Sequence, residues 1–124
     1  MLFFFTILII GCKTKTKEEY FKIGCEKFEI GDYSSAIREF NNAIKIDSNF
    51  DKALYRRAET KYKLKDYNGA IKDFSLLIKI APKQPELYFN RAVAYGDLND
   101  YVKEIEDYNK AISLTYRQSQ LRQR

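Results

Sequence analysis

The feature that most constrains this chain is a ten-residue phrase that occurs three times. It reads GDYSSAIREF at residues 31–40, KDYNGAIKDF at 65–74 and NDYVKEIEDY at 99–108. Equivalent residues, such as Tyr33, Tyr67 and Tyr101, are 34 positions apart in both intervals. A fixed period of this length is typical of stacked structural repeats, in which each unit buries its apolar side against a neighbour.

Each 34-residue unit shows helical spacing of apolar residues twice, once on each side of the Asp-Tyr pair. In the second unit, Leu54, Ala58 and Tyr62 share one helical face, while Phe74 and Ile78 share another. The pattern predicts an all-α chain of three helix-turn-helix repeats at residues 17–50, 51–84 and 85–118, with order beginning near residue 20. The six helices are expected to pair antiparallel, because a tight turn separates the two helices of each unit.

Small residues recur where the two helices of a unit would cross. They are Gly24 with Ala36, Ala58 with Ala70, and Ala92 opposite Glu104. On these residues and on the period, the chain from residue 17 to about 118 resembles the tetratricopeptide repeat family. The resemblance implies a right-handed solenoid of three repeats that serves protein–protein interaction.

The third repeat departs most from the family's pattern. Glu104 stands where alanine is expected, and a charge cannot be buried against Ala92 unless it is paired. Tyr116 replaces the proline expected at the end of a repeat, and the polar segment RQSQLRQR at residues 117–124 provides no capping helix. We therefore expect the side of the last helix that bears Ile105 and Ile112 to be left exposed or to be covered by another chain.

The chain begins MLFFFTILIIGC, which is apolar from Leu2 to Ile10 except for Thr6. This run is too short to span a bilayer and has the length of a signal-peptide hydrophobic region. Residues 9–12 resemble a bacterial lipobox, which implies cleavage before Cys12 and a diacylglycerol on its sulfur. No basic residue precedes the run, so the alternative is a buried apolar leader or a start that lies upstream. We expect a signal peptide at 1–11 and a lipid anchor with a tether at 12–19.

The net charge of +5 comes from the two flanks of the chain. Residues 18–116 contain all 17 acidic residues and 16 of the 22 basic ones. The remaining basic residues are Lys13, Lys15, Lys17, Arg117, Arg122 and Arg124. Basic flanks suit a solvated tether, a membrane-surface contact and a polar basic tail at 119–124, and they do not indicate a nucleic-acid groove.

The composition argues against catalysis. The chain has no histidine, which is the usual general base and the commonest metal ligand. It also has no glycine-rich phosphate loop. We expect no enzyme activity, no cofactor and no metal site. The acidic residues of the repeated phrase, Asp32, Asp66 and Asp100, stand at predicted helix starts and are interpreted as helix caps.

The resemblance also implies a binding groove, because the first helix of each repeat lines the concave side of such arrays. Carried over by position, the columns on these helices are largely aromatic, and aromatic rings suit peptide anchors as well as packing between repeats. Both interpretations stay open for the rings. The expected groove consists of Phe21, Cys25, Phe28, Lys52, Tyr55, Glu59, Tyr62, Lys63, Phe89 and Val93.

A second pattern links charges at a fixed separation. Arg57 and Arg91 occupy the same repeat position, and Asp73 and Asp107 follow each of them by sixteen residues. The first repeat lacks this arginine and has Ile23 in its place. We predict that Arg57 pairs with Asp73 and Arg91 with Asp107, with pairing of Asp73 to Arg91 between repeats as the alternative.

These observations predict a non-catalytic adaptor of the bacterial cell envelope. It would be held at a membrane by lipid on Cys12 and would bind a protein or peptide segment in the groove. The alternative is a structural self-association module, or part of a longer array, that assembles through the third repeat as a homo-oligomer. The sequence does not identify the partner.

Overall fold

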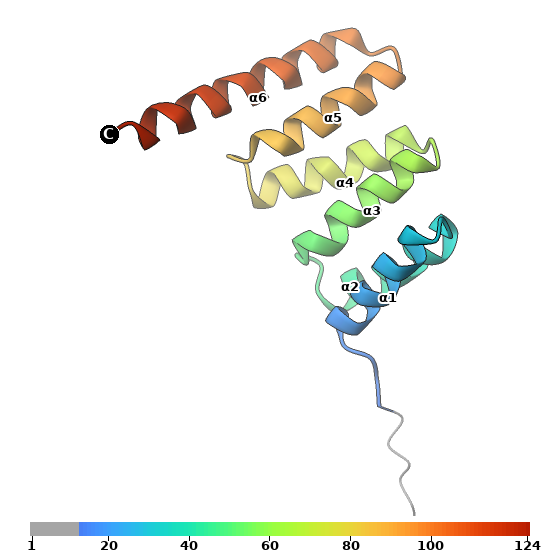
Figure 1. The fold of residues 1–124 in the computed structure, drawn as a ribbon. Coiled ribbons are helices and arrows are strands. Elements are labelled where there is room, and N and C mark those ends of the chain that lie inside the picture. The colour runs from blue at the N-terminus through green and yellow to red at the C-terminus, as the bar shows by residue number, and fades with distance from the viewer. Residues whose placement is uncertain (1–12) are drawn as a thin grey trace, which may run out of the picture.

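The computed structural model describes residues 13–124, so the apolar leader and Cys12 lie outside the described residues. Its helices are α1 (Lys17–Glu29), α2 (Tyr33–Ile46), α3 (Asp51–Lys63), α4 (Tyr67–Ile80), α5 (Pro85–Asp97) and α6 (Tyr101–Arg122). They stack in chain order, with α1 at one end of the array and α6 at the other (Figure 1). The expected all-α solenoid of three helix pairs is confirmed.

No helix between residues 13 and 124 is both long enough and apolar enough to span a bilayer.

The tight turn inside each repeat is built in the same way three times. The residue before each aspartate has a positive φ, which lets the chain reverse direction between the paired helices. The aspartate side chain then accepts a hydrogen bond from the backbone N–H three residues later, which caps the second helix. The turn residues are Gly31–Asp32, Lys65–Asp66 and Asn99–Asp100, and the prediction that these aspartates are caps is confirmed.

Two helix ends differ from the sequence-based boundaries. The first helix begins at Lys17 and not near residue 20, because Thr16 and Glu19 form a reciprocal capping box. The last helix runs on to Arg122, so most of the polar tail at 119–124 is helical. Residues 116–122 contain no glycine or proline, and Gln, Arg and Leu favour helix.

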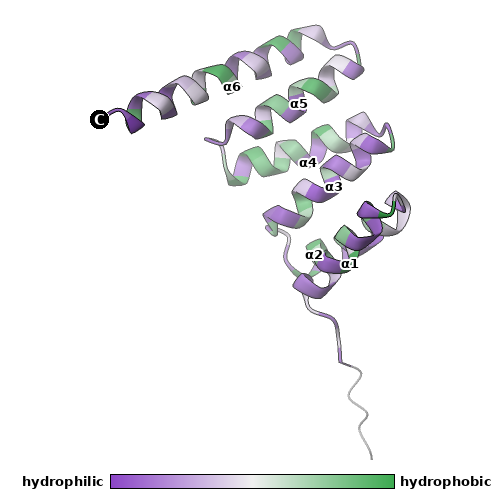
Figure 2. Ribbon diagram, viewed as in Figure 1, coloured by the Kyte–Doolittle hydropathy of each residue, from purple (hydrophilic) through white to green (hydrophobic). Residues whose placement is uncertain are grey.

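The core lies where the small residues let the paired helices approach. Ala36, Ala58, Ala70 and Ala92 are fully buried at these crossings. At Gly24 even a methyl group would lie 2.5 Å from the ring of Phe40, so this position needs glycine. The central helix α4 shows a large share of hydrophobic residues, consistent with its place between two neighbouring helices (Figure 2).

The carboxylate of Glu104 lies beside Gly96. The Glu104 side chain is half-buried, and a Cβ atom at Gly96 would be 2.7 Å from Oε1. The missing side chain at Gly96 therefore provides the space that this carboxylate occupies. The first two repeats instead have the ring pairs Phe28–Tyr33 and Tyr62–Tyr67 at the corresponding place.

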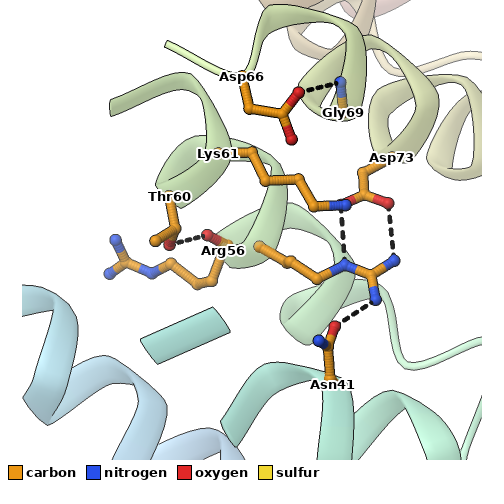
Figure 3. A network of polar contacts seen from close by, with 8 residues as sticks. Asn41, Arg56, Thr60, Lys61, Asp66, Gly69 and Asp73 are labelled. Atoms are coloured by element: carbon orange, nitrogen blue, oxygen red, sulfur yellow. Dashed lines mark hydrogen bonds and ion pairs between the residues drawn. The ribbon is translucent and has the colours of Figure 1, made fainter. Parts of the chain in front are cut away.

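The predicted ion pairs within each repeat are confirmed. Arg57 donates to both carboxylate oxygens of Asp73, at 2.8 and 2.7 Å, and Asp73 is only 1% exposed. Arg91 binds Asp107 in the same bidentate way, at 2.7 and 2.8 Å. Lys61 adds a third contact to Asp73 at 2.9 Å (Figure 3). The hydrogen bonds to Asp107 raise the pKa of Arg91 above its already high ordinary value.

Each of these arginines also donates a hydrogen bond to the preceding repeat, which the charge pattern did not predict. The Nη1 atom of Arg57 donates to Asn41 on α2 at 2.7 Å (Figure 3). The Nη1 atom of Arg91 donates to Ser75 on α4 at 2.9 Å. One guanidinium group therefore connects three helices, since it joins its own helix pair to the second helix of the repeat before.

A double-mutant cycle at Arg57 and Asp73 tests whether this pair sets the helix register. Asp73→Ala should lower the free energy of unfolding by about 3 kcal/mol, because it leaves Arg57 and Lys61 without their shared carboxylate. The double variant Arg57→Ala/Asp73→Ala should cost at least about 1 kcal/mol less than the sum of the two single variants. Urea unfolding followed by circular dichroism measures all three changes.

The matched control is the neighbouring pair Arg38–Glu39, whose closest atoms are 3.4 Å apart and whose Arg38 side chain is 68% exposed. Its coupling should stay within about 0.5 kcal/mol. Equal coupling in the two cycles would mean that Arg57 and Asp73 behave as ordinary surface charges.

Candidate functional site

The first helices of neighbouring repeats contact each other directly along one side of the array. Arg56 of α3 lies over the ring of Phe28 of α1, with its guanidinium carbon 5.4 Å from the ring centre. Tyr55 of α3 hydrogen-bonds to Glu86 and Asn90 of α5. The first helices α1, α3 and α5 therefore form a continuous surface. The groove was expected on this surface.

Two hollows lie next to each other on this surface. The first has a volume of about 410 Å³ and is bounded by expected groove residues Phe21, Lys52 and Tyr55, together with Arg56 and Glu86. The second, of about 300 Å³, contains the other expected residues except one. These are Phe28, Glu59, Tyr62, Lys63, Phe89 and Val93.

Cys25 lines neither hollow. Its side chain is half-buried on α1, and burial raises the pKa of its thiol. The positive charge of the nearby Arg56 guanidinium lowers the same pKa in part. The structure therefore places Cys25 beside the groove wall as a small packing residue.

The two groove tyrosines of α3 are fixed by hydrogen bonds across the repeat boundary. The Tyr55 hydroxyl donates to Glu86 Oε1 at 2.9 Å and accepts from Asn90 Nδ2 at 3.0 Å. The Tyr62 hydroxyl donates to Asp97. The ring of Tyr55 also packs edge-on against Phe74, with centres 6.0 Å apart. These rings thus join repeats two and three and also line the hollows, while their role as peptide anchors stays a prediction.

Glu86, Asn90 and Asp97 were not among the expected groove residues. A signal for two of them was present in the sequence. Tyr55 to Asn90 and Tyr62 to Asp97 are each separated by 35 positions, which is one repeat plus one residue. Neighbouring first helices therefore meet at this offset, and polar pairs at this offset are candidates for contacts between repeats.

Phe89 is the most available aromatic ring of the groove. It is 51% exposed, although it packs against Tyr108 with ring centres 5.4 Å apart. It borders the second hollow and also a third, of about 550 Å³, where α5 meets α6 near Ile112 and Tyr116. A ring held by one neighbour and open on its other side is suited to contact a ligand.

The charges around the hollows are of both signs. Lys52 and Arg56 face Glu86 at the first hollow, while Lys63 and Glu59 border the second. Arg56 is 3.2 Å from Glu59, and Asn90 is bonded to Tyr55, so both are already engaged. These contacts disfavour a dedicated clamp for a terminal carboxylate and favour a ligand with mixed charge.

Within residues 13–124, no three His, Cys, Asp or Glu side chains are grouped as metal ligands would be.

Family models match consecutive parts of the chain. A model described as TPR repeat matches residues 24–65, and two described as tetratricopeptide repeat match residues 52–83 and 85–117. Together these matches extend over most of the described helices. The sequence matches no curated protein.

Solved structures share the fold. A MamA structure superposes with a TM-score of 0.81 at 20% identity, over 85% of this chain and 61% of that one. MamA 41-end from Desulfovibrio magneticus RS-1 gives 0.74 at 28% identity, over 79% and 55%. The chain therefore spans about three fifths of the MamA chains. The first TPR of Spaghetti (RPAP3) bound to the HSP90 peptide SRMEEVD gives 0.74 at 21% identity, over 80% and 79%.

The tyrosine hydrogen bonds give a testable pH dependence. Burial and then the hydrogen bond to Glu86 raise the pKa of Tyr55 to about 12, from an ordinary value of 10.0. For Tyr62 the hydrogen bond to Asp97 comes first and burial second, and its pKa also rises to about 12. Because both values are higher in the folded chain, the stabilisation is complete below pH 10 and is lost toward pH 12.

We expect Tyr55→Phe to lower the free energy of unfolding by about 1 kcal/mol at pH 8, and the difference from wild type to shrink between pH 10 and 12. Urea unfolding across this pH range measures it. Tyr101→Phe is the control, because the exposed Tyr101 hydroxyl bonds only to Asn99 nearby. A pH-independent effect of Tyr55→Phe would contradict the assignment.

Proposed function

Since this chain belongs to the tetratricopeptide repeat family, we propose that it is a non-catalytic adaptor that binds a peptide or protein segment along its first helices. The observation that carries the proposal is the pair of adjoining hollows with the half-exposed ring of Phe89 at their edge. Support comes from the Spaghetti (RPAP3) structure, in which the same fold is bound to a peptide.

The chemistry of the groove indicates what such a segment would contain. Phe28, Tyr62 and Phe89 offer aromatic surface for an apolar side chain of the ligand. The rim alternates in sign, from Lys52 and Arg56 to Glu86. We infer a segment with one or two apolar anchors between charged residues, bound through its side chains and not through a terminal carboxylate.

We further propose that lipid on Cys12 holds the array at a membrane of the bacterial cell envelope, which rests on the sequence of residues 1–12. Helix α1 begins at Lys17, and its cap Thr16 follows Cys12 by four residues. Four extended residues span at most about 14 Å. An anchor on Cys12 would therefore keep the first repeat within one tether length of the lipid surface.

Phe89 is a better position than Tyr55 for a test of binding. Removing Tyr55 would also break its bonds to Glu86 and Asn90, so a loss of binding would be hard to separate from damage to the fold. We expect Phe89→Ala to weaken partner binding by about 2 kcal/mol, which is roughly 30-fold in Kd. The measurement is affinity purification of the full chain from membranes, followed by titration with the recovered partner.

Leu98→Ala is the matched control, because Leu98 is an exposed apolar residue that follows α5 and lies outside all of these hollows. Its partner recovery and Kd should equal those of wild type. If Phe89→Ala and Leu98→Ala retain the partner equally, the groove is not the binding site.

The lipid anchor has its own test. Mass spectrometry of the chain from bacterial membranes should find an acylated Cys12 at the N-terminus and no residues 1–11. Cys12→Ser should remain uncleaved and unacylated, while Cys25→Ser, the other cysteine variant, should be processed like wild type. An intact Met1 with an unmodified Cys12 in the membrane fraction would overturn this part of the proposal.

A further inference from the structure

The outer face of α6 repeats the surface that α2 and α4 present to the next repeat. In the first two repeats this surface consists of two isoleucines with a small polar residue between them. Ile44 packs on the core around Leu54, and Ile78 packs against Tyr88, so each is covered by the following helix. The equivalent triads are Ile37, Asn41 and Ile44, then Ile71, Ser75 and Ile78, then Ile105, Asn109 and Ile112.

On α6 this surface is uncovered. Ile105 is 58% exposed and Ile112 is 67% exposed, whereas their counterparts on α4 are half-buried. Val102 and Tyr116 extend the apolar stripe toward both ends of the helix, at 70% and 65% exposure. Hydrophobic segments recur from the start of α6 to its middle, and its C-terminal end is mainly hydrophilic (Figure 2). The face opposite the buried residues of α6 is thus apolar over about four turns.

Within residues 13–124, no segment folds back over this stripe as the next first helix does in the earlier repeats. Helices α2 and α4 end at Ile46 and Ile80, and the chain then returns as the next first helix. At the equivalent place α6 continues, through Thr115 to Arg122 (Figure 1). Gln118 fixes this extension by donating to the carbonyl oxygen of Lys83 at 3.0 Å. The straight extension leaves the stripe free for another molecule.

Charged residues on one side of the stripe, namely Glu106, Lys110 and Arg117, indicate which molecule. Glu106 stands in the first half of α6 and Arg117 in the second half, eleven residues later and on the same side of the stripe. Both side chains are exposed, and neither has an ion-pair partner among residues 13–124. A second α6 laid antiparallel would bring Glu106 of each copy beside Arg117 of the other, and would also oppose the two helix dipoles.

We propose that two copies of this chain pair through α6, antiparallel about a two-fold axis near Asn109 and Ile112. The positions of the stripe alternate at spacings of three and four, from Val102 through Ile105, the polar Asn109 and Ile112 to Tyr116, which is the spacing of a two-helix seam. Ile105 of one copy then lies opposite Tyr116 of the other. The first two hollows contain none of these seam residues, whereas the third hollow is shared by Phe89 with Ile112 and Tyr116.

The other end of the array fits α6 less well. On α1 the positions equivalent to Leu54 and Arg57 are Tyr20 and Ile23, and both are half-buried. Lys15 covers Tyr20, with its amino nitrogen 5.5 Å from the ring centre. A head-to-tail contact would have to displace this lysine, and it would propagate into a filament and not close as a dimer.

Sedimentation equilibrium of the full chain in density-matched detergent tests the pairing. Wild type should be a dimer, and Ile112→Glu should raise the dimer Kd by about 100-fold or more, because it places carboxylates in the seam. Ile30→Glu is the matched control, since Ile30 is 73% exposed at the far end of the array and its variant should dimerise like wild type. A monomeric wild type, or a dimer that Ile112→Glu leaves intact, overturns the proposal.

A charge exchange tests the antiparallel arrangement. Glu106→Arg should weaken the dimer about tenfold at low salt. The new positive charge at position 106 of each copy would then repel Arg117 of the other copy. Glu106→Arg/Arg117→Glu should return the Kd to within about threefold of wild type, since the pairs are restored with the signs reversed. If the double variant is no tighter than Glu106→Arg, or if mass grows beyond the dimer with concentration, the antiparallel two-fold pairing is wrong.

Discussion

The structure depends on the contact between one repeat and the next, because a single helix pair of this size cannot bury its apolar face. Arg57 and Arg91 carry much of that contact. Each binds a nearly buried aspartate of its own repeat in bidentate fashion and also an oxygen of the preceding repeat. Replacing such a pair by apolar residues often costs little stability, so the larger effect of these ion pairs is on how the helices align. The first repeat has Ile23 at this position and no repeat before it to hold.

Much of the fold could be predicted from the 34-residue period alone. The period places six helices, and the Asp-Tyr phrase places the turn that each aspartate caps. Asp73 and Asp107 each follow an arginine of the same repeat position by sixteen residues, and this pattern also predicted the ion pairs. The extension of α6 was missed because the helix was expected to end with the repeat. A helix continues until a helix-breaking or capping residue ends it. The place of Glu104 was missed because this residue was compared with Ala92 alone and not with the free space at Gly96.

The candidate site was predictable in its location but less so in its details. Nine of the ten expected residues line two hollows, which follows from first helices that face the same way. The role of each ring depends on atoms that a column of aromatic residues does not reveal. Tyr55 and Tyr62 carry hydroxyls and find acceptors on α5, whereas Phe21 and Phe28 at the same positions cannot. The first helices of repeats two and three are therefore joined by tyrosine hydrogen bonds, while those of repeats one and two are joined by the stacking of Arg56 on Phe28.

Because each arginine binds a residue of the preceding repeat, the number of repeats in such a chain can change during evolution. Each arginine needs only a small polar acceptor on whichever repeat precedes it, and Asn41 and Ser75 are equivalent in that respect. A loss of residues 51–84 would place Asn41 where Ser75 now meets Arg91, and Ile44 where Ile78 now meets Tyr88, whereas a duplication would place Ser75 before a second copy of Arg57. Whole repeats are thus interchangeable units, and the number of repeats can drift by in-frame copying or excision without any new contact having to evolve first.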